Sequence, residues 1–103
     1  MRRRVVVTGL GVISPLGLEV ETFWRNIVAG KSGVSMLEAF DATEFDTKIA
    51  AEVKGFEPTN YFEKKDARRM DRFVQFAVAA AQQGLADSNL TITAENAHKV
   101  GVL

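Results

Sequence analysis

Four basic side chains near the middle of the chain are the residues best suited to bind a partner. Lys65, Arg68, Arg69 and Arg72 follow the spacing i, i+3, i+4 and i+7. At about 100° per residue, they would cover roughly 100° of the circumference of a continuous helix. Because like charges at this spacing repel by a few tenths of a kcal/mol, the stripe favours an anionic partner. A solvated charged face is the alternative.

Covalent and metal chemistry have few candidates in this sequence. The 103 residues include no cysteine and one histidine, His98. Without cysteine, these residues cannot supply a thiolate nucleophile, a disulfide or a thiolate metal site. A lone histidine just before an apolar segment is more typical of a surface or capping residue. We therefore assign no catalytic, cofactor-binding or metal-binding residue and expect no cofactor.

A glycine-rich loop near the start resembles a phosphate-binding loop only in part. Gly9 and Gly11 match the first two glycines of G-x-G-x-x-G, but Ser14 stands at the third, followed by Pro15 and Gly17. No strand ending in an acidic residue follows at the distance that a dinucleotide fold requires. We therefore keep a nucleotide-binding half-domain only as a remote alternative and expect the two glycines to form a tight turn.

Two amphipathic helices are expected to position these residues. Residues 19–29 carry apolar side chains at helical spacing, with Gly30 placed to end the helix, and Trp24 is expected in the core. Asp71 is a plausible N-cap for a second helix that reaches about residue 87. Its expected apolar face consists of Phe73, Phe76, Ala77, Ala80, Gly84 and Leu85. Ala79, Ala80, Ala81 and Gly84 make this helix narrow, which permits close approach of a neighbouring element.

Strands and loops are expected around these helices. Residues 4–8 and 99–103 are expected as buried strands, and residues 48–53 as a short strand. Residues 31–47 show no period and are expected to cross the surface, whereas residues 59–70 suit one or two short helices. The order of elements indicates an α/β layered fold. An apolar final segment with nothing polar beyond it predicts a chain that continues, with about half of the sheet present.

Composition excludes several classes of function. The 13 basic and 13 acidic residues cancel, so no overall field attracts nucleic acid or an anionic membrane surface. The start, with three arginines before three valines, imitates a signal peptide, but glycine, proline and serine interrupt the apolar run. No stretch approaches the about 20 apolar residues of a membrane span. We expect a cytoplasmic protein that binds neither nucleic acid nor membrane.

Four sequence blocks, taken together, resemble the β-ketoacyl synthases of the type II, elongating kind. These are RRVVVTGLGVISPLG at residues 3–17, FWRNIVAGKSG at 23–33, KIAAEV at 48–53 and KKDARRMDRFVQFA at 64–77. The blocks occur in the family's order, and the resemblance covers essentially all of the chain. It implies a thiolase-like layered α/β fold, of which residues 1–103 would be the N-terminal part of the first half, truncated before the catalytic cysteine.

The resemblance also implies an activity and partners. The complete protein would be a homodimeric 3-oxoacyl-[acyl-carrier-protein] synthase of fatty acid biosynthesis, which condenses an acyl thioester with malonyl-acyl carrier protein. By the resemblance, Lys65, Arg68 and Arg69 match basic residues that dock the acidic carrier protein, whereas Arg72 does not clearly match. The family's catalytic histidines lie in its second half, so His98 is not one of them. A non-catalytic subunit of the chain-length-factor kind, from a polyketide-type synthase, remains the alternative.

Overall fold

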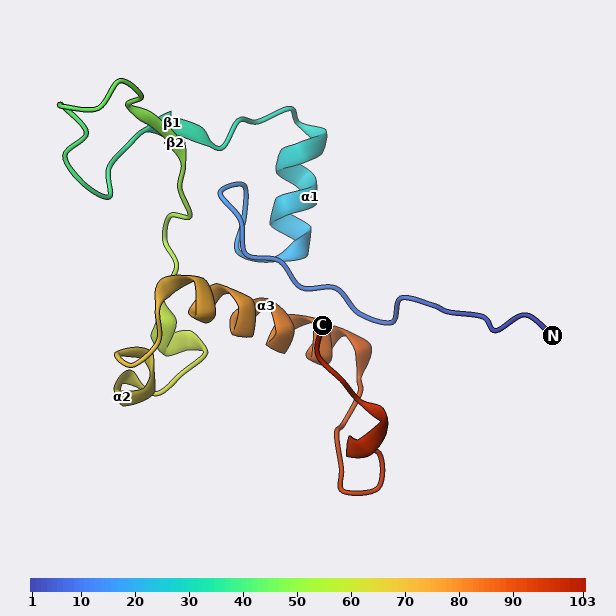
Figure 1. The fold of residues 1–103 in the computed structure, drawn as a ribbon. Coiled ribbons are helices and arrows are strands. Elements are labelled where there is room, and N and C mark those ends of the chain that lie inside the picture. Colours follow the sequence, from blue (N-terminus) through green and yellow to red (C-terminus); the bar gives the residue numbers. More distant parts are fainter.

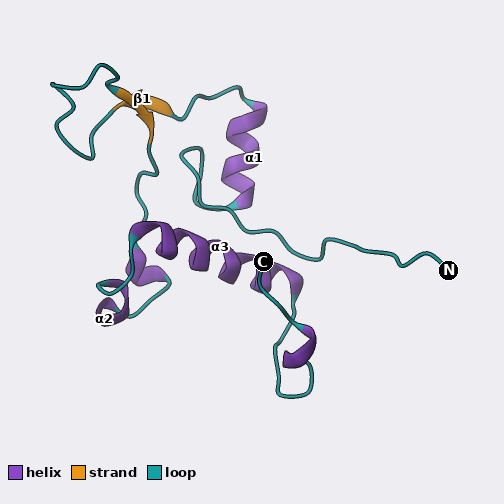
Figure 2. Ribbon diagram, viewed as in Figure 1, coloured by secondary structure: helices purple, strands orange, loops and turns teal.

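The computed structural model describes all residues, 1–103, as a chain of helices with one small sheet (Figures 1 and 2). The elements are α1 (Val20–Val28), β1 (Val34–Met36), β2 (Ile49–Ala51), η1 (Pro58–Asn60), α2 (Lys64–Ala67), α3 (Arg72–Ser88) and η2 (Ala97–Lys99), where η marks a 3₁₀ helix. Both expected helices are therefore present, with bounds within about two residues of those predicted. None of these helices could span a lipid bilayer.

Helix α1 ends as the sequence predicts, but its apolar stripe is only partly covered. Gly30 adopts a φ of +68°, its N–H donates to the Ile27 carbonyl, and the Lys31 N–H donates to the Asn26 carbonyl. This pair of bonds is the Schellman arrangement, which favours glycine. Trp24, however, is 64% exposed, so the expectation that it packs in a core is wrong for this chain. Val20 and Phe23 at the start of the helix are half-buried beside the loop at Gly17, whereas Ile27 and Val28 at its end are exposed.

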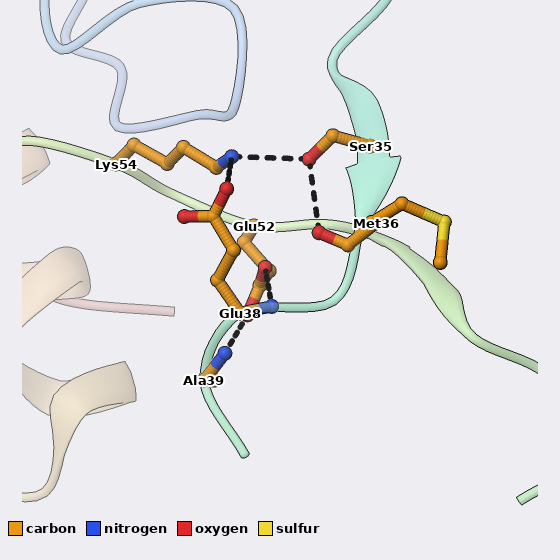
Figure 3. A network of polar contacts seen from close by, with 6 residues as sticks. All are labelled: Ser35, Met36, Glu38, Ala39, Glu52 and Lys54. Atoms are coloured by element: carbon orange, nitrogen blue, oxygen red, sulfur yellow. Dashed lines mark hydrogen bonds and ion pairs between the residues drawn. The ribbon is translucent and has the colours of Figure 1, made fainter. Parts of the chain in front are cut away.

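The sheet is a two-stranded antiparallel hairpin in which Ser35 pairs with Ala50. Strand β2 confirms the strand expected at residues 48–53, whereas β1 lies within residues 31–47, where the absence of a period predicts only a segment that crosses the surface. Both Glu52 carboxylate oxygens accept backbone N–H groups of the connecting loop, at 2.9 Å from Glu38 and Ala39 (Figure 3). Lys54 Nζ lies 2.9 Å from Glu38 Oε1. These contacts close a loop that shows no periodic pattern.

The strands expected at residues 4–8 and 99–103 do not form. Val5, Val6 and Val7 are 93%, 67% and 79% exposed, and Val102 is 98% exposed. A strand requires a neighbour for its N–H and C=O groups, and no segment of residues 1–103 pairs with either run. Figure 1 shows the first residues extending away from the helices. The observed order is therefore helix, two paired strands and helix, without a layered sheet.

The segment that follows, residues 9–12, runs against helix α3. A Cβ atom added to Gly11 would lie 1.9 Å from the Ala80 carbonyl oxygen, and one added to Gly9 would lie 2.2 Å from that of Gly84. Between the two glycines the Leu10 N–H donates to Asp87 Oδ2 at 2.9 Å, and just after them the Val12 N–H donates to Gln83 Oε1 at 3.1 Å. Gly9 and Gly11 therefore serve the helix contact rather than a turn of their own.

The core is small and lies around the junction of α2 and α3. Only four residues are buried, namely Phe56, Ala67, Gln75 and Ala79. The Phe56 ring packs edge-on against Phe76 at 5.0 Å and is stacked on Tyr61 at 5.8 Å. Aromatic pairs of this geometry each contribute about 0.5–1.5 kcal/mol beyond the burial of their area. Residues 56–79 are thus the best-packed part of the chain.

Candidate functional site

The predicted docking residues Lys65, Arg68 and Arg69, called the basic cluster below, lie at this packed junction. Lys65 belongs to the four-residue helix α2, Arg68 caps it and Arg69 follows in the same turn. All three side chains are exposed. The structure therefore presents the three residues together on one short element.

Arg72 leaves the stripe that its spacing predicts. Helix α2 ends at Ala67, and Asp71 adopts an extended conformation with φ −66° and ψ 154° before α3 begins. Asp71 is the N-cap, as predicted, although its carboxylate makes no capping hydrogen bond. Arg72 Nη2 donates to the Val53 carbonyl at 3.0 Å, and its guanidinium carbon lies 4.9 Å from the centre of the Phe76 ring. Arg72 is thus part of the scaffold.

No carboxylate neutralises the basic cluster. The acidic neighbours Glu63 and Asp66 are exposed, and the single ion pair in the chain joins Lys54 to Glu38. Three cations without an internal counterion attract an anionic partner and raise its association rate more than its final affinity. The cluster is thereby available to an external anion.

Gln75 connects helix α3 to the turn that carries the two arginines. Its side chain is 8% exposed, and Nε2 donates to the Ala67 carbonyl at 2.9 Å and to the Met70 carbonyl at a longer 3.5 Å. Buried polar groups are tolerated where they find such partners. The sequence interpretation omitted Gln75 because it counted only apolar residues as the packed face. The available signal was the i, i+4 spacing of Gln75 and Ala79, which places the glutamine on the same face of α3 as the buried alanine.

The packed face of α3 is consequently rotated from the predicted one. Phe76, Ala80 and Gly84 lie on it as expected, but Ala77 is exposed, Phe73 is 71% exposed and Leu85 is 40% exposed. Their place is taken by the i, i+4 series of Gln75, Ala79, Gln83 and Asp87. Gln83 Nε2 donates to the Leu18 carbonyl at 2.7 Å and to the Tyr61 hydroxyl oxygen at 2.9 Å. Polar side chains with partners define this face.

A carboxylate caps the N-terminus of η1, the 3₁₀ helix that precedes α2. Glu57 accepts from the Thr59 hydroxyl at 2.8 Å and from the Thr59 N–H at 3.2 Å. These two bonds, the hydroxyl first, hold the pKa of Glu57 below its ordinary value of 4.5, because they favour the charged form. The same arrangement between Asp41 and Thr43 lowers the pKa of Asp41. Both carboxylates close local turns and are fully exposed.

No constellation for covalent or metal chemistry accompanies the basic cluster. His98 lies in η2, at the opposite end of α3 from the cluster. No group of three or more histidine, cysteine, aspartate or glutamate side chains is placed to hold a metal ion. An open hollow is lined by α1, α3 and the aromatic residues Phe56 and Tyr61. Its lining includes Gln83 and Asp87, which already serve internal hydrogen bonds.

Comparisons with known proteins agree on one family. Residues 2–103 match the family model described as the N-terminal domain of β-ketoacyl synthases. The chain is 54% identical over 101 residues to 3-oxoacyl-[acyl-carrier-protein] synthase 2 of Vibrio harveyi. It is 52% identical over 101 residues to the protein of the same name from Coxiella burnetii. Each match covers 98% of this chain and 24% of the relative.

A solved structure agrees with these matches. The structure described as the ishigamide ketosynthase/chain length factor superposes with a TM-score of 0.80 and 42% sequence identity. The superposition covers 88% of this chain and 23% of that one. The chain therefore spans about a quarter of the length of the proteins that it matches.

Proposed function

The chain belongs to the β-ketoacyl synthase family, and from this membership we propose that it is the N-terminal segment of a 3-oxoacyl-[acyl-carrier-protein] synthase whose own task is to dock the carrier protein. The observation that carries the docking role is the basic cluster: Lys65, Arg68 and Arg69 are exposed, adjacent and without an ion-pair partner. An acidic carrier protein with a phosphopantetheine phosphate is the complementary partner. The names of the relatives include that carrier protein.

The reaction of the complete synthase would be a decarboxylative Claisen condensation. A cysteine thiolate takes the acyl group from its carrier as a thioester, and two histidines assist the loss of CO₂ from malonyl-carrier protein. The carbanion then attacks the thioester carbonyl and expels the thiolate. Residues 1–103 contain no cysteine, so the nucleophile would come from elsewhere in the synthase. This segment would bring the substrate to it.

The layered fold of the family accounts for the exposed apolar surface. Trp24 and Val5–Val7 would be covered by the rest of a thiolase-like domain, in which residues 4–8 would find strand neighbours. The accessible surface of 8697 Å² exceeds the about 5,700 Å² expected of a folded monomer of this mass. The excess is of the size that a large intramolecular interface would bury. The resemblance further suggests that the complete synthase pairs with a second copy.

A graft tests the docking role directly. In this graft, the present chain replaces the aligned 101 residues of the Vibrio harveyi synthase. Reversing Lys65, Arg68 and Arg69 to glutamate is expected to raise the KM for acyl-carrier protein on the order of tenfold, with kcat unchanged. The effect should shrink as salt is added, because screening weakens the lost attraction. Steady-state kinetics with acyl-pantetheine, assayed with malonyl-pantetheine in place of malonyl-carrier protein, should show no change, because neither substrate carries a protein.

A second triple variant controls for the change in net charge. Arg25, Lys31 and Lys99 are exposed and lie outside the basic cluster, so their reversal to glutamate alters the charge equally. This variant is expected to keep the KM of the parent graft. An unchanged KM in the Lys65, Arg68 and Arg69 variant would overturn the docking role. Equal losses in both variants would assign the effect to overall charge.

A non-catalytic subunit is the second candidate function. The solved structure with a TM-score of 0.80 is described as both a ketosynthase and a chain length factor, so similarity at this segment agrees with either kind of subunit. The nucleophile distinguishes them. A polypeptide that carries this segment and becomes acylated by acyl-carrier protein is a synthase. One that resists acylation while folded is the non-catalytic kind.

A further inference from the structure

The turn that carries two residues of the basic cluster is too short to hold its own shape. Helix α2 has four residues, and isolated helices shorter than about 12 residues are marginal in water. The Met70 N–H donates to the Ala67 carbonyl at 3.2 Å, which closes a turn with Arg68 and Arg69 as its two central residues. The direction of both arginines therefore depends on what fixes this turn.

One side chain reaches both ends of the turn. Gln75 Nε2 donates to the carbonyl of its first residue, Ala67, and to that of its last, Met70. The Ala67 carbonyl thus accepts from the Met70 N–H and from Gln75 together, which uses both of its lone pairs. Gln75 and Ala67 are two of the four buried residues, at 8% and 9% exposed. The amide is shielded from competing water.

We propose that Gln75 is a positioning residue for carrier-protein docking: its buried side-chain amide bridges the two carbonyls that flank Arg68 and Arg69 and fixes their direction toward the carrier protein. This inference rests on the docking function proposed above and deepens it. Gln75 itself is too buried to touch the partner. Without the bridge, both arginines keep their charge and exposure, but their common orientation is lost. The charges would still attract the carrier protein, with fewer productive encounters.

The test compares three glutamines of the same helix in the graft. Gln75→Met keeps the side-chain length and removes the donor, and it is expected to raise the KM for acyl-carrier protein about fivefold, which is less than the charge reversal does. The kcat and the kinetics with acyl-pantetheine should stay at the parent values. Gln82→Met, at an exposed position, should change nothing. Gln83→Met loses donors to Leu18 and Tyr61 and should lower stability without this selective change in KM.

The salt dependence of KM separates positioning from loss of charge. Because Gln75→Met retains all three cations, KM should depend on salt concentration as steeply as in the parent, whereas the triple charge reversal should flatten that dependence. Hydrogen exchange of residues 64–71 should accelerate in Gln75→Met and not in Gln82→Met, because the turn loses its anchor. If Gln75→Met fails to fold, judged by lost activity with acyl-pantetheine, Gln75→Asn replaces it in the test. Gln75→Asn keeps a buried amide but is too short to reach both carbonyls, so the same selective rise in KM is expected.

Each outcome decides between the two proposals. A normal KM in Gln75→Met, with faster exchange and a raised KM in the charge-reversed variant, overturns the positioning role and leaves docking intact. A normal KM in the charge-reversed variant overturns docking and, with it, the role of Gln75. A raised KM that Gln83→Met reproduces in full would assign the effect to general loss of stability. A selective rise in Gln75→Met with an unchanged salt dependence supports the proposal.

Discussion

Gly9 and Gly11 occupy positions where a single carbon atom decides whether the first segment can reach helix α3. Their sequence context suggested a phosphate loop or a tight turn. The structure places them instead against the backbone oxygens of Gly84 and Ala80, at distances that no side chain would permit. Glycine is required at such close approaches of two backbones. The same residue type thus serves a contact that neither motif predicted.

Substituting Gly11 tests this contact at the scale of one residue. Gly11→Ala in the graft is expected to lower the free energy of unfolding by about 1–3 kcal/mol, because the added carbon would overlap the Ala80 carbonyl. Gln82→Ala is the control, since Gln82 lies at an exposed position of α3. Urea denaturation measures both variants. Equal stability of the two would show that residues 9–12 do not lie against α3.

The four basic residues show that neighbouring segments determine which charged side chains stay exposed. Spacing predicted one stripe of Lys65, Arg68, Arg69 and Arg72. The break at Asp71 turns Arg72 toward the Val53 carbonyl and the Phe76 ring, where it stabilises the junction. The other three remain exposed. Residues at helical spacing share one exposed face only where the helix is continuous.

At the scale of elements, helix α3 organises the chain by contacts with four other places in the sequence. Its polar ridge bonds to residues 10–12 through Gln83 and Asp87, to Leu18 and Tyr61 through Gln83, and to the α2 turn through Gln75. An apolar stripe alone would not fix the rotation of this helix. Directional hydrogen bonds do so, because each requires one donor to meet one acceptor.

The end of α3 offers a prediction at this scale. Asn89 caps the helix with a φ of +56°, in the left-handed region. Asn89→Gly is expected to be neutral or slightly stabilising, whereas Asn89→Val should cost about 1–2 kcal/mol, because a branched side chain is strained there. Urea denaturation of both variants in the graft provides the comparison. Equal stabilities would mean that the helix ends in another conformation.

At the scale of the whole molecule, the chain is more extended than a domain of its length. Its radius of gyration is 17.3 Å, against about 13 Å for a compact domain of this size. Large apolar side chains are exposed along most of the sequence, and burial is confined to the junction of α2 and α3. A core this small leaves little to offset the conformational entropy lost on folding. The basic cluster nevertheless lies on the part that is packed.

The isolated chain should therefore behave differently from the graft. We expect residues 1–103 alone to bind the apolar dye ANS and to lack a sharp unfolding transition, as in expanded states with exposed apolar surface. In the graft, the same residues should be covered, and unfolding should be cooperative. Dye fluorescence and urea titration followed by circular dichroism measure the difference. Cooperative unfolding of the isolated chain would contradict the proposed need for a covering domain.

Sequence alone determined the features that depend on local chemistry. The bounds of α1 and α3, the glycine that ends α1, the N-cap position of Asp71, the strand at residues 49–51 and the family all follow from spacing, conformational preference or the resemblance. So does the choice of Lys65, Arg68 and Arg69 as candidate docking residues, whose exposure and grouping the structure then supplies.

Other features depend on contacts between segments that are distant in the sequence. The runs at residues 4–8 and 99–103 have strand-like composition but no partner within the chain, so no strand forms there. The rotation of α3, the withdrawal of Arg72 and the bridge from Gln75 to the arginine turn each depend on a segment that local patterns do not specify. Side-chain periodicity determines which face of a helix can be buried. The segment that packs against the helix determines which face is buried.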